Sequence, residues 1–191
     1  MHEKLNSISD LTEITLSSER KYDGNIISVD VLDIELPDGR RSKREVVRHK
    51  NAVAVLSRLP DGRFVFVQQY RKAAEEALLE IIAGGLEDGE SPDEGARRET
   101  AEETGYEVVS IRKLTSIICT PGYCDERIHL FFAELSDRPH EQHQDADENV
   151  YPVILSEEEV NAAIRDGTIS DAKTIAAWAY YLLDKREPVN G

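Results

Sequence analysis

Three glutamates are spaced so that their side chains meet on one face of a predicted helix. Glu99, Glu102 and Glu103 stand at i, i+3 and i+4, positions that converge on the same side of an α-helix. Like charges at this spacing destabilise a helix by roughly 0.2–0.5 kcal/mol per pair, and a divalent cation would remove that repulsion. Carboxylate oxygens suit Mg²⁺ or Mn²⁺, which bind through a few carboxylates together with substrate phosphates. The alternative is a solvated acidic face with no ligand.

The helix that carries these glutamates has clear start and stop signals. Ser91 and Glu94 form a capping box, and Pro92 stands at the first helical position, where its missing N–H costs nothing. Gly105 stands where a helix ends in the left-handed conformation. The sequence therefore predicts a helix over about 92–104, preceded by a glycine-rich loop.

The frame around the glutamates resembles the Nudix box, the signature of hydrolases that cleave nucleoside diphosphates linked to another moiety. Here it reads Gly84-x5-Glu90-x7-Arg98-Glu99-x2-Glu102-Glu103-x-Gly105. The one departure is Thr100, where the family prefers an aliphatic residue. We expect Thr100 to face the sheet, so the change affects packing and leaves the metal chemistry intact.

The resemblance implies a role for each residue of the box. Glu99, Glu103 and the Ala83 carbonyl would ligate Mg²⁺ (Mn²⁺ is possible), and Glu102 would share a second or third ion. The bound metal would polarise the phosphoryl oxygens and activate water. Arg98 would orient Glu90 and the glutamates at the catalytic centre without touching the substrate.

Segments outside the box look like the ADP-ribose pyrophosphatase branch of the family. They are Gln68-Gln69-Tyr70-Arg71, the lead-in Leu79–Gly84, and Thr120–Glu126, with Pro121 placed 16 residues beyond Gly105. The resemblance extends from Tyr22 to Lys185. It implies hydrolysis of ADP-ribose to AMP and ribose 5-phosphate, and a homodimer in which the N-terminal sheet of one subunit helps build the partner's substrate pocket. The chain lacks the aromatic residue that the family often places after the Tyr-x-Gly turn and has Asn25-Ile26-Ile27 there.

Three residues are candidates for substrate binding. Arg71 ends a predicted strand and could clamp a phosphate through its planar guanidinium, or it could form only a surface ion pair. Arg44 has the same two interpretations, and the resemblance favours substrate binding for both. Glu126 is assigned to the substrate on the resemblance of its segment. Glu80 lies in an apolar run and should be a structural carboxylate with a partner.

The resemblance also implies a general base on a loop late in the chain. The polar, acidic stretch 136–149 is long enough to be that loop. Its candidates are Asp145, Asp147 and Glu148, of which Glu148 has the longest reach and best matches the family's acidic pair. An acidic loop that is only solvated is the alternative.

Composition limits the classes of protein. The 191 residues suit one domain with a terminal elaboration. A net charge of −15, from 23 Lys+Arg and 38 Asp+Glu, argues against a nucleic-acid or membrane surface and means that a diphosphate needs bound metal or local arginines. Cys119 and Cys124 look like reduced thiols. With no bilayer-spanning run and no signal peptide, we expect a cytoplasmic enzyme.

The remaining pattern predicts an α/β fold, an α/β/α sandwich with a mixed sheet plus a small N-terminal antiparallel sheet. Residues 1–17 are expected to be a loose arm, and 78–82 a single short strand. A closing helix over 171–185 is expected to bury the side with Ile175, Trp178, Ala179 and Leu182. The expected division is 1–48, for dimerisation and the substrate pocket, and 49–191, the Nudix domain with its C-terminal helix.

Two other functions fit the same residues. The nearest is hydrolysis of another nucleoside diphosphate sugar, such as GDP-mannose, by the same chemistry. From a different class, the chain could be a nucleotide-binding regulator that has lost activity. The intact box argues against the regulator, because a sensor need not keep every metal carboxylate.

Overall fold

The computed structural model describes residues 11–140 and 149–186. By its internal contacts the chain divides into two compact units. The first comprises residues 1–50 and 120–126, and the second comprises 51–119 and 127–191.

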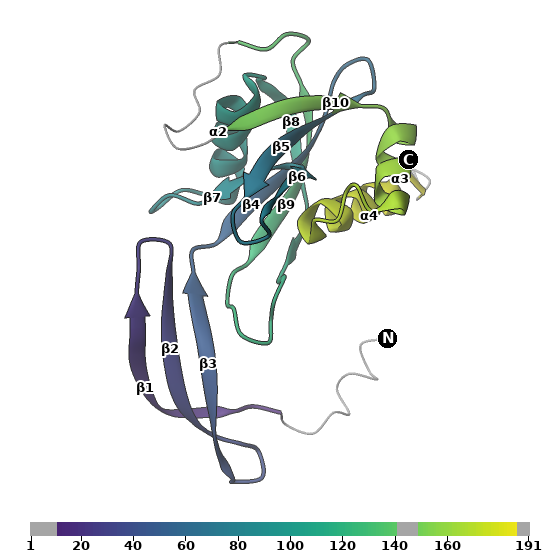
Figure 1. Ribbon diagram of the computed structural model, residues 1–191. Helices are drawn as coiled ribbons and strands as arrows, with labels where there is room; N and C mark the ends of the chain where they lie inside the picture. The colour runs from purple at the N-terminus through teal and green to yellow at the C-terminus, as the bar shows by residue number, and fades with distance from the viewer. Residues whose placement is uncertain (1–10, 141–148, 187–191) are drawn as a thin grey trace, which may run out of the picture. The chain divides into compact units, whose positions relative to one another are not determined.

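The first unit is a three-stranded antiparallel sheet, in the order β1 (Ile14–Asp23), β2 (Ile27–Glu35) and β3 (Arg41–His49). The three strands run side by side in Figure 1. Gly39, at φ 83°, closes the tight turn between β2 and β3. The buried carboxylate of Asp30 accepts hydrogen bonds from Arg20 on β1 and Arg48 on β3, so one acidic group ties all three strands together.

The expectation of a loose arm through residue 17 is wrong, because β1 begins at Ile14 and pairs with β2 along its whole length. All ten residues of β1 are exposed. The strand is held by its backbone ladder and by polar side-chain bonds to β2, and it has no alternation of buried and exposed side chains that a sequence pattern could reveal.

The second unit contains a seven-stranded mixed sheet. Its main path runs in the order β10-β5-β4-β9-β8, with β6 paired to β5 and β7 paired to β4. The β4–β9 pair is parallel, and the other pairs are antiparallel. The strands are β4 (Ala52–Arg58), β5 (Phe64–Arg71), β6 (Glu76–Glu80), β7 (Ile82–Gly85), β8 (Val108–Ile117), β9 (Ile128–Leu135) and β10 (Val150–Leu155).

Helices cover both faces of this sheet (Figure 1). Alternate residues of β4 pack to opposite sides: Ala54 and Leu56 with Trp178 and other residues of one cluster, and Val53 and Val55 in a second cluster with Ala96. The first side is covered by α3 (Glu157–Asp166) and α4 (Ala172–Arg186), and the second by α2 (Pro92–Thr104). The predicted α/β/α sandwich is confirmed.

Two local expectations are corrected in this unit. The segment expected to be a single strand over 78–82 belongs to two strands, β6 and β7, which are separated by Ile81. β6 pairs with β5, and β7 pairs with β4. The expected buried side of α4 is confirmed in part, since Trp178 is buried and Leu182 packs against the core, whereas Ala179 is exposed and Ile175 is 38% exposed. The residues buried on α4 are Lys173, Thr174, Ala177, Trp178 and Tyr181.

The reason is that polar contacts anchor the first turn of α4. Lys173 pairs with Glu80, and Thr174 accepts a hydrogen bond from the backbone of Ile81. These contacts turn the helix so that two polar side chains are buried and Ile175 faces outward. None of the described helices is long and apolar enough to cross a membrane.

Candidate active site

The helix α2 forms as its sequence signals predict. Ser91 caps the N-terminus, Glu94 completes the capping box, and Gly105 ends the helix at φ 73°. Thr100 is fully buried, and its hydroxyl donates to the Ala96 carbonyl one turn earlier, 2.7 Å away. The hydroxyl of Thr100 therefore has a hydrogen-bond partner within the helix, although the side chain is buried.

The predicted carboxylates lie together on this helix at different depths. Glu99 and Glu103 are buried, at 9% and 4% exposure, whereas the side chain of Glu102 is 40% exposed. A cluster that only solvated the surface would not bury two of its three charges. The burial therefore argues against a merely solvated acidic face.

Arg98 distributes its hydrogen bonds among three carboxylates. Its Nη1 donates to Glu99 at 2.6 Å and to Glu102 at 3.0 Å, while Nε and Nη2 donate to the two oxygens of Glu90 at 2.8 and 2.9 Å. Nη2 also donates to the Gly85 carbonyl at 3.0 Å. These bonds from Arg98, helped by the backbone N–H of Glu87, lower the pKa of Glu90 to about 2. One guanidinium thus links the loop before α2 to the carboxylates on it.

Gly84 brings backbone directly against a predicted ligand. A Cβ at this position would lie 2.0 Å from the carboxyl carbon of Glu99, far inside contact distance. Only glycine leaves room for the carboxylate here. The neighbouring Gly85 has nothing within 4 Å of the same position, so the close approach is specific to Gly84.

The donor set at this place fits a hard divalent cation. Carboxylates on one helix face and a strand backbone held against one of them are ligands of the type that Mg²⁺ and Mn²⁺ prefer. Within residues 11–140 and 149–186, no group of three or more His, Cys, Asp and Glu side chains is arranged so that it could hold a metal ion. Arg98 bridges Glu99 and Glu102 and balances part of their charge.

Arg71 is paired with Glu80 in a two-point ion pair. Its Nε and Nη2 donate to Oε1 and Oε2 of Glu80 at 2.9 and 2.8 Å. The side chain of Arg71 stays 40% exposed, whereas Glu80 is 1% exposed. Burial would raise the pKa of Glu80, but the hydrogen bonds from Arg71 and the charge of Lys173 lower it overall. Glu80 is therefore the satisfied buried carboxylate that its sequence context predicts.

Two predicted substrate-binding residues belong to the first unit and have partners there. Arg44 forms an ion pair with Glu13, and Glu126 lies 3.3 Å from the Nδ1 atom of His49. The candidate general base Glu148, like Asp145 and Asp147, lies outside the described residues.

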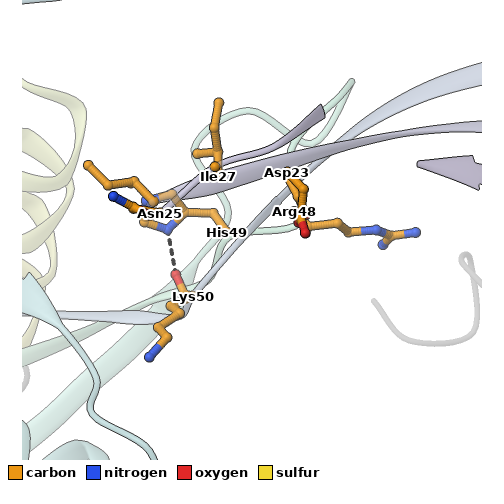
Figure 2. Close-up of a pocket in the computed structure, with 9 residues that line it drawn as sticks. Asp23, Asn25, Ile27, Arg48, His49 and Lys50 are labelled. Atoms are coloured by element: carbon orange, nitrogen blue, oxygen red, sulfur yellow. Dashed lines mark hydrogen bonds between the residues drawn. The ribbon is translucent and has the colours of Figure 1, made fainter. Parts of the chain in front are cut away.

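A surface hollow of about 300 Å³ lies at the turn between β1 and β2. Figure 2 shows its labelled residues, with the imidazole of His49 directed at the carbonyl of Lys50, 2.6 Å away. The lining also contains Asn25, Ile26 and Ile27, the segment that lacks the family's aromatic residue. Aliphatic and amide groups thus stand at this hollow in place of an aromatic ring.

Sequence reasoning missed the residues that surround Glu80. Lys173 and Asp171, at the start of α4, join the Glu80 ion pair. Their only signal was a lysine next to a threonine in the first turn of an amphipathic helix, which by itself predicts an exposed side chain.

Comparison with known proteins identifies two matching regions. Residues 48–178 match the family described as NUDIX domain, and residues 13–47 match the family described as nucleoside diphosphate sugar hydrolase N-terminal domain.

Similar proteins cover nearly the whole chain. The chain is 40% identical to an ADP-ribose pyrophosphatase of Bacillus subtilis and 41% identical to a methanol dehydrogenase activator of Bacillus methanolicus, each match covering 91% of this chain and 94% of the relative. It is 38% identical to a GDP-mannose pyrophosphatase of Yersinia enterocolitica, over 72% of this chain and 76% of that protein. A crystal structure of an ADP compounds hydrolase has the same fold, with a TM-score of 0.81 at 23% identity, covering 94% of this chain and 99% of the other.

Proposed function

Because the chain belongs to the Nudix hydrolase family, we propose that it hydrolyses the pyrophosphate bond of ADP-ribose to give AMP and ribose 5-phosphate. The observation that carries the proposal is the box from Gly84 to Gly105, with Glu99 and Glu103 buried on α2 and Glu99 held against Gly84. The choice of ADP-ribose rests on the relative of that name, which is 40% identical over 91% of the chain.

The box residues would hold Mg²⁺, or Mn²⁺ in its place. Glu99, Glu103 and the Ala83 carbonyl are the proposed ligands, and Glu102 would share a further ion. When bound, such a cation neutralises phosphoryl charge and makes water a better nucleophile near neutral pH.

The residues of the chain bind and orient the reacting groups. Arg98 fixes the positions of Glu90, Glu99 and Glu102 and keeps Glu90 ionised. Arg71 keeps its Nη1 group outside the Glu80 ion pair and would donate it to a phosphate oxygen of the substrate. Arg44 and Glu126 would contact the rest of the nucleotide sugar.

Glu148 is the proposed general base. A positioned base typically contributes 10²–10⁴-fold to the rate. Glu148→Gln should therefore lower kcat by about that factor, with KM and metal dependence little changed. A loss below about tenfold, with a larger loss in Asp147→Asn, would move the role to Asp147.

A cytoplasmic homodimer with composite sites is part of the proposal. The first unit exposes Leu11, Ile14, Leu16 and Tyr22 along β1 and just before it, an apolar edge of the kind that a second copy would cover. Light scattering at micromolar concentration decides the state. A fully active monomer would refute the dimer.

The second candidate substrate is GDP-mannose, favoured by the relative of Yersinia enterocolitica. A third candidate function is that of a nucleotide-binding regulator, and the relative named methanol dehydrogenase activator is the reason to test it. Product release from a panel of nucleoside diphosphate sugars, measured with Mg²⁺ and with Mn²⁺, separates them. We expect the highest kcat/KM for ADP-ribose. A higher kcat/KM for GDP-mannose would make GDP-mannose the proposed substrate in place of ADP-ribose. If no member of the panel is hydrolysed, the result favours the regulatory role.

A further inference from the structure

A closed ring of hydrogen bonds and ion pairs surrounds the break between β6 and β7. The backbone N–H of Ile81 donates to the Thr174 hydroxyl at 3.0 Å, and that hydroxyl donates to Asp171 at 2.6 Å. Lys173 then forms an ion pair with Asp171 at 3.0 Å and donates a hydrogen bond to Glu80. Since Glu80 directly precedes Ile81 in the chain, the ring is complete.

The ring is largely buried, and it carries a net negative charge unless Arg71 is counted with it. Glu80, Lys173 and Thr174 are 1%, 8% and 0% exposed. Glu80 and Asp171 carry two negative charges and Lys173 carries one positive charge, so the ring without Arg71 has a net charge of −1. Arg71, bound to Glu80 by two hydrogen bonds, brings the total to zero.

The same guanidinium also lies within electrostatic reach of α2. The hydrogen bond to Glu80 is the largest influence on the pKa of Arg71 and raises it against the effect of burial. The charges of Glu80, Glu103 and Asp171 raise it further. Arg71 is therefore influenced by the charge of Glu103, one carboxylate of the box, as well as by the ring.

We propose that Lys173 is a positioning residue that keeps the charge of Arg71 available to the substrate. By pairing with Glu80, Lys173 cancels one of the two negative charges of the ring, and the ring fixes the direction of the Arg71 guanidinium. Without Lys173 the group of four residues would have a net charge of −1 and would repel a diphosphate. The inference rests on the proposed function, in which Arg71 holds a phosphate of a nucleoside diphosphate sugar.

A purely structural role for the ring makes a different prediction. If the ring only stabilised the fold, breaking it at Lys173 or at Asp171 would lower stability and activity in the same direction. An electrostatic role makes the two changes opposite, because one removes a positive charge and the other removes a negative charge.

The test compares Lys173→Met with Asp171→Asn. Lys173→Met should raise KM for ADP-ribose about tenfold, with kcat within about threefold of wild type. Asp171→Asn should leave KM unchanged or lower it, because it removes a negative charge near Arg71. The asparagine oxygen can still accept the hydrogen bond from Thr174. Lys173→Arg should restore the wild-type KM. The matched control is Lys185→Met on the same helix, which removes an equal charge at an exposed ion pair with Glu157 and should leave KM unchanged.

Equilibrium binding separates this inference from the proposed function. Calorimetric titration with ADP-ribose and with inorganic pyrophosphate, in metal-free buffer, should give the same order of Kd among the variants. If wild type binds ADP-ribose but hydrolyses no nucleoside diphosphate sugar, the proposed function fails while the Kd order still tests Lys173. Weaker binding in both variants, in proportion to their loss of Tm, would make the ring merely structural. If no anion binds wild type, Arg71 holds no phosphate and the inference is overturned.

Discussion

Two networks of charged side chains in the second unit differ in their balance: carboxylates are in excess in one, and the other is neutral. On α2 one guanidinium, that of Arg98, serves Glu90, Glu99 and Glu102, and Glu103 is buried one turn beyond Glu99. At the break between β6 and β7, Arg71 and Lys173 face Glu80 and Asp171 in equal number.

The difference in charge balance predicts different roles for the two networks: ligand binding for the α2 network and structural support for the balanced one. Buried like charges are costly unless a counter-charge joins them, so the excess of carboxylates on α2 favours a bound cation. The balanced network needs no further ion and can hold backbone and side chains in place. Changes to the first network should therefore affect turnover most, and changes to the second should affect stability and affinity.

The largest effect is expected when a carboxylate of the α2 network becomes an amide. Glu99→Gln and Glu103→Gln should each lower kcat by about 10³-fold or more, because each removes a charged ligand worth several kcal/mol in the transition state. Tm in metal-free buffer should be unchanged or slightly higher, since like-charge repulsion falls. Steady-state kinetics with Mg²⁺, calorimetry with Mn²⁺ and thermal melting check this. A near-wild-type kcat in either variant would show that the ligand assignment is wrong.

The next effect tests the close approach of strand to helix. Gly84→Ala should push the Glu99 carboxylate from its place, because the new Cβ would lie 2.0 Å from it. A shift of about 1 Å in a reacting group can cost about 10²-fold in kcat. Gly85→Ala is the matched control, since its Cβ meets nothing within 4 Å, and it should retain kcat within a few-fold. Equal losses in the two variants would contradict the special role of Gly84.

The α2 network could be predicted from sequence because its determinants are local. The capping box, the final Gly105 and the three glutamates lie within 15 residues of one another, and the geometry of one helix fixes which side chains share a face. The continuous apolar runs that open β4 and β5 are likewise typical of strands buried on both faces.

The balanced network could not be predicted because its partners are distant in the chain. Lys173 and Glu80, like Thr174 and Ile81, are joined across a separation of 93 residues. The apolar pattern of the helix therefore assigned Ile175 to the buried side and gave no sign that Lys173 is buried, and tertiary contacts decided both positions. The strand β1 escaped prediction for a related reason, since its backbone ladder and the side-chain bonds from Ser17 and Arg20 join it to β2 while all its residues stay exposed.

A stability effect is expected from the balanced network. Thr174→Val keeps the volume of the side chain but leaves the buried N–H of Ile81 without its acceptor, at a cost of about 1–3 kcal/mol in the free energy of unfolding. Thr174→Ser keeps the hydroxyl and should lose less. Urea unfolding with unchanged m-value measures both. If valine costs no more than serine, the hydrogen bond to Ile81 contributes nothing to stability.

The smallest effect at neutral pH is expected from a change at Glu90, whose ionisation makes the stability of the α2 network depend on pH. The pKa of Glu90 is about 2 in the folded protein against 4.5 in the unfolded chain, chiefly because Arg98 donates to both oxygens. A lowered folded-state pKa adds stability above pH 4.5, and that stability is lost as the pH falls from about 4.5 towards 2. Glu90→Gln has no charge to lose, so its unfolding free energy should fall less steeply than that of wild type over this window. At pH 7 its Tm should be only a few degrees lower, because glutamine still offers an acceptor to Arg98. Other acids titrate in the same range, and the difference between the two urea-unfolding curves from pH 7 to 3 isolates Glu90. Parallel curves would show that Arg98 does not hold Glu90 ionised.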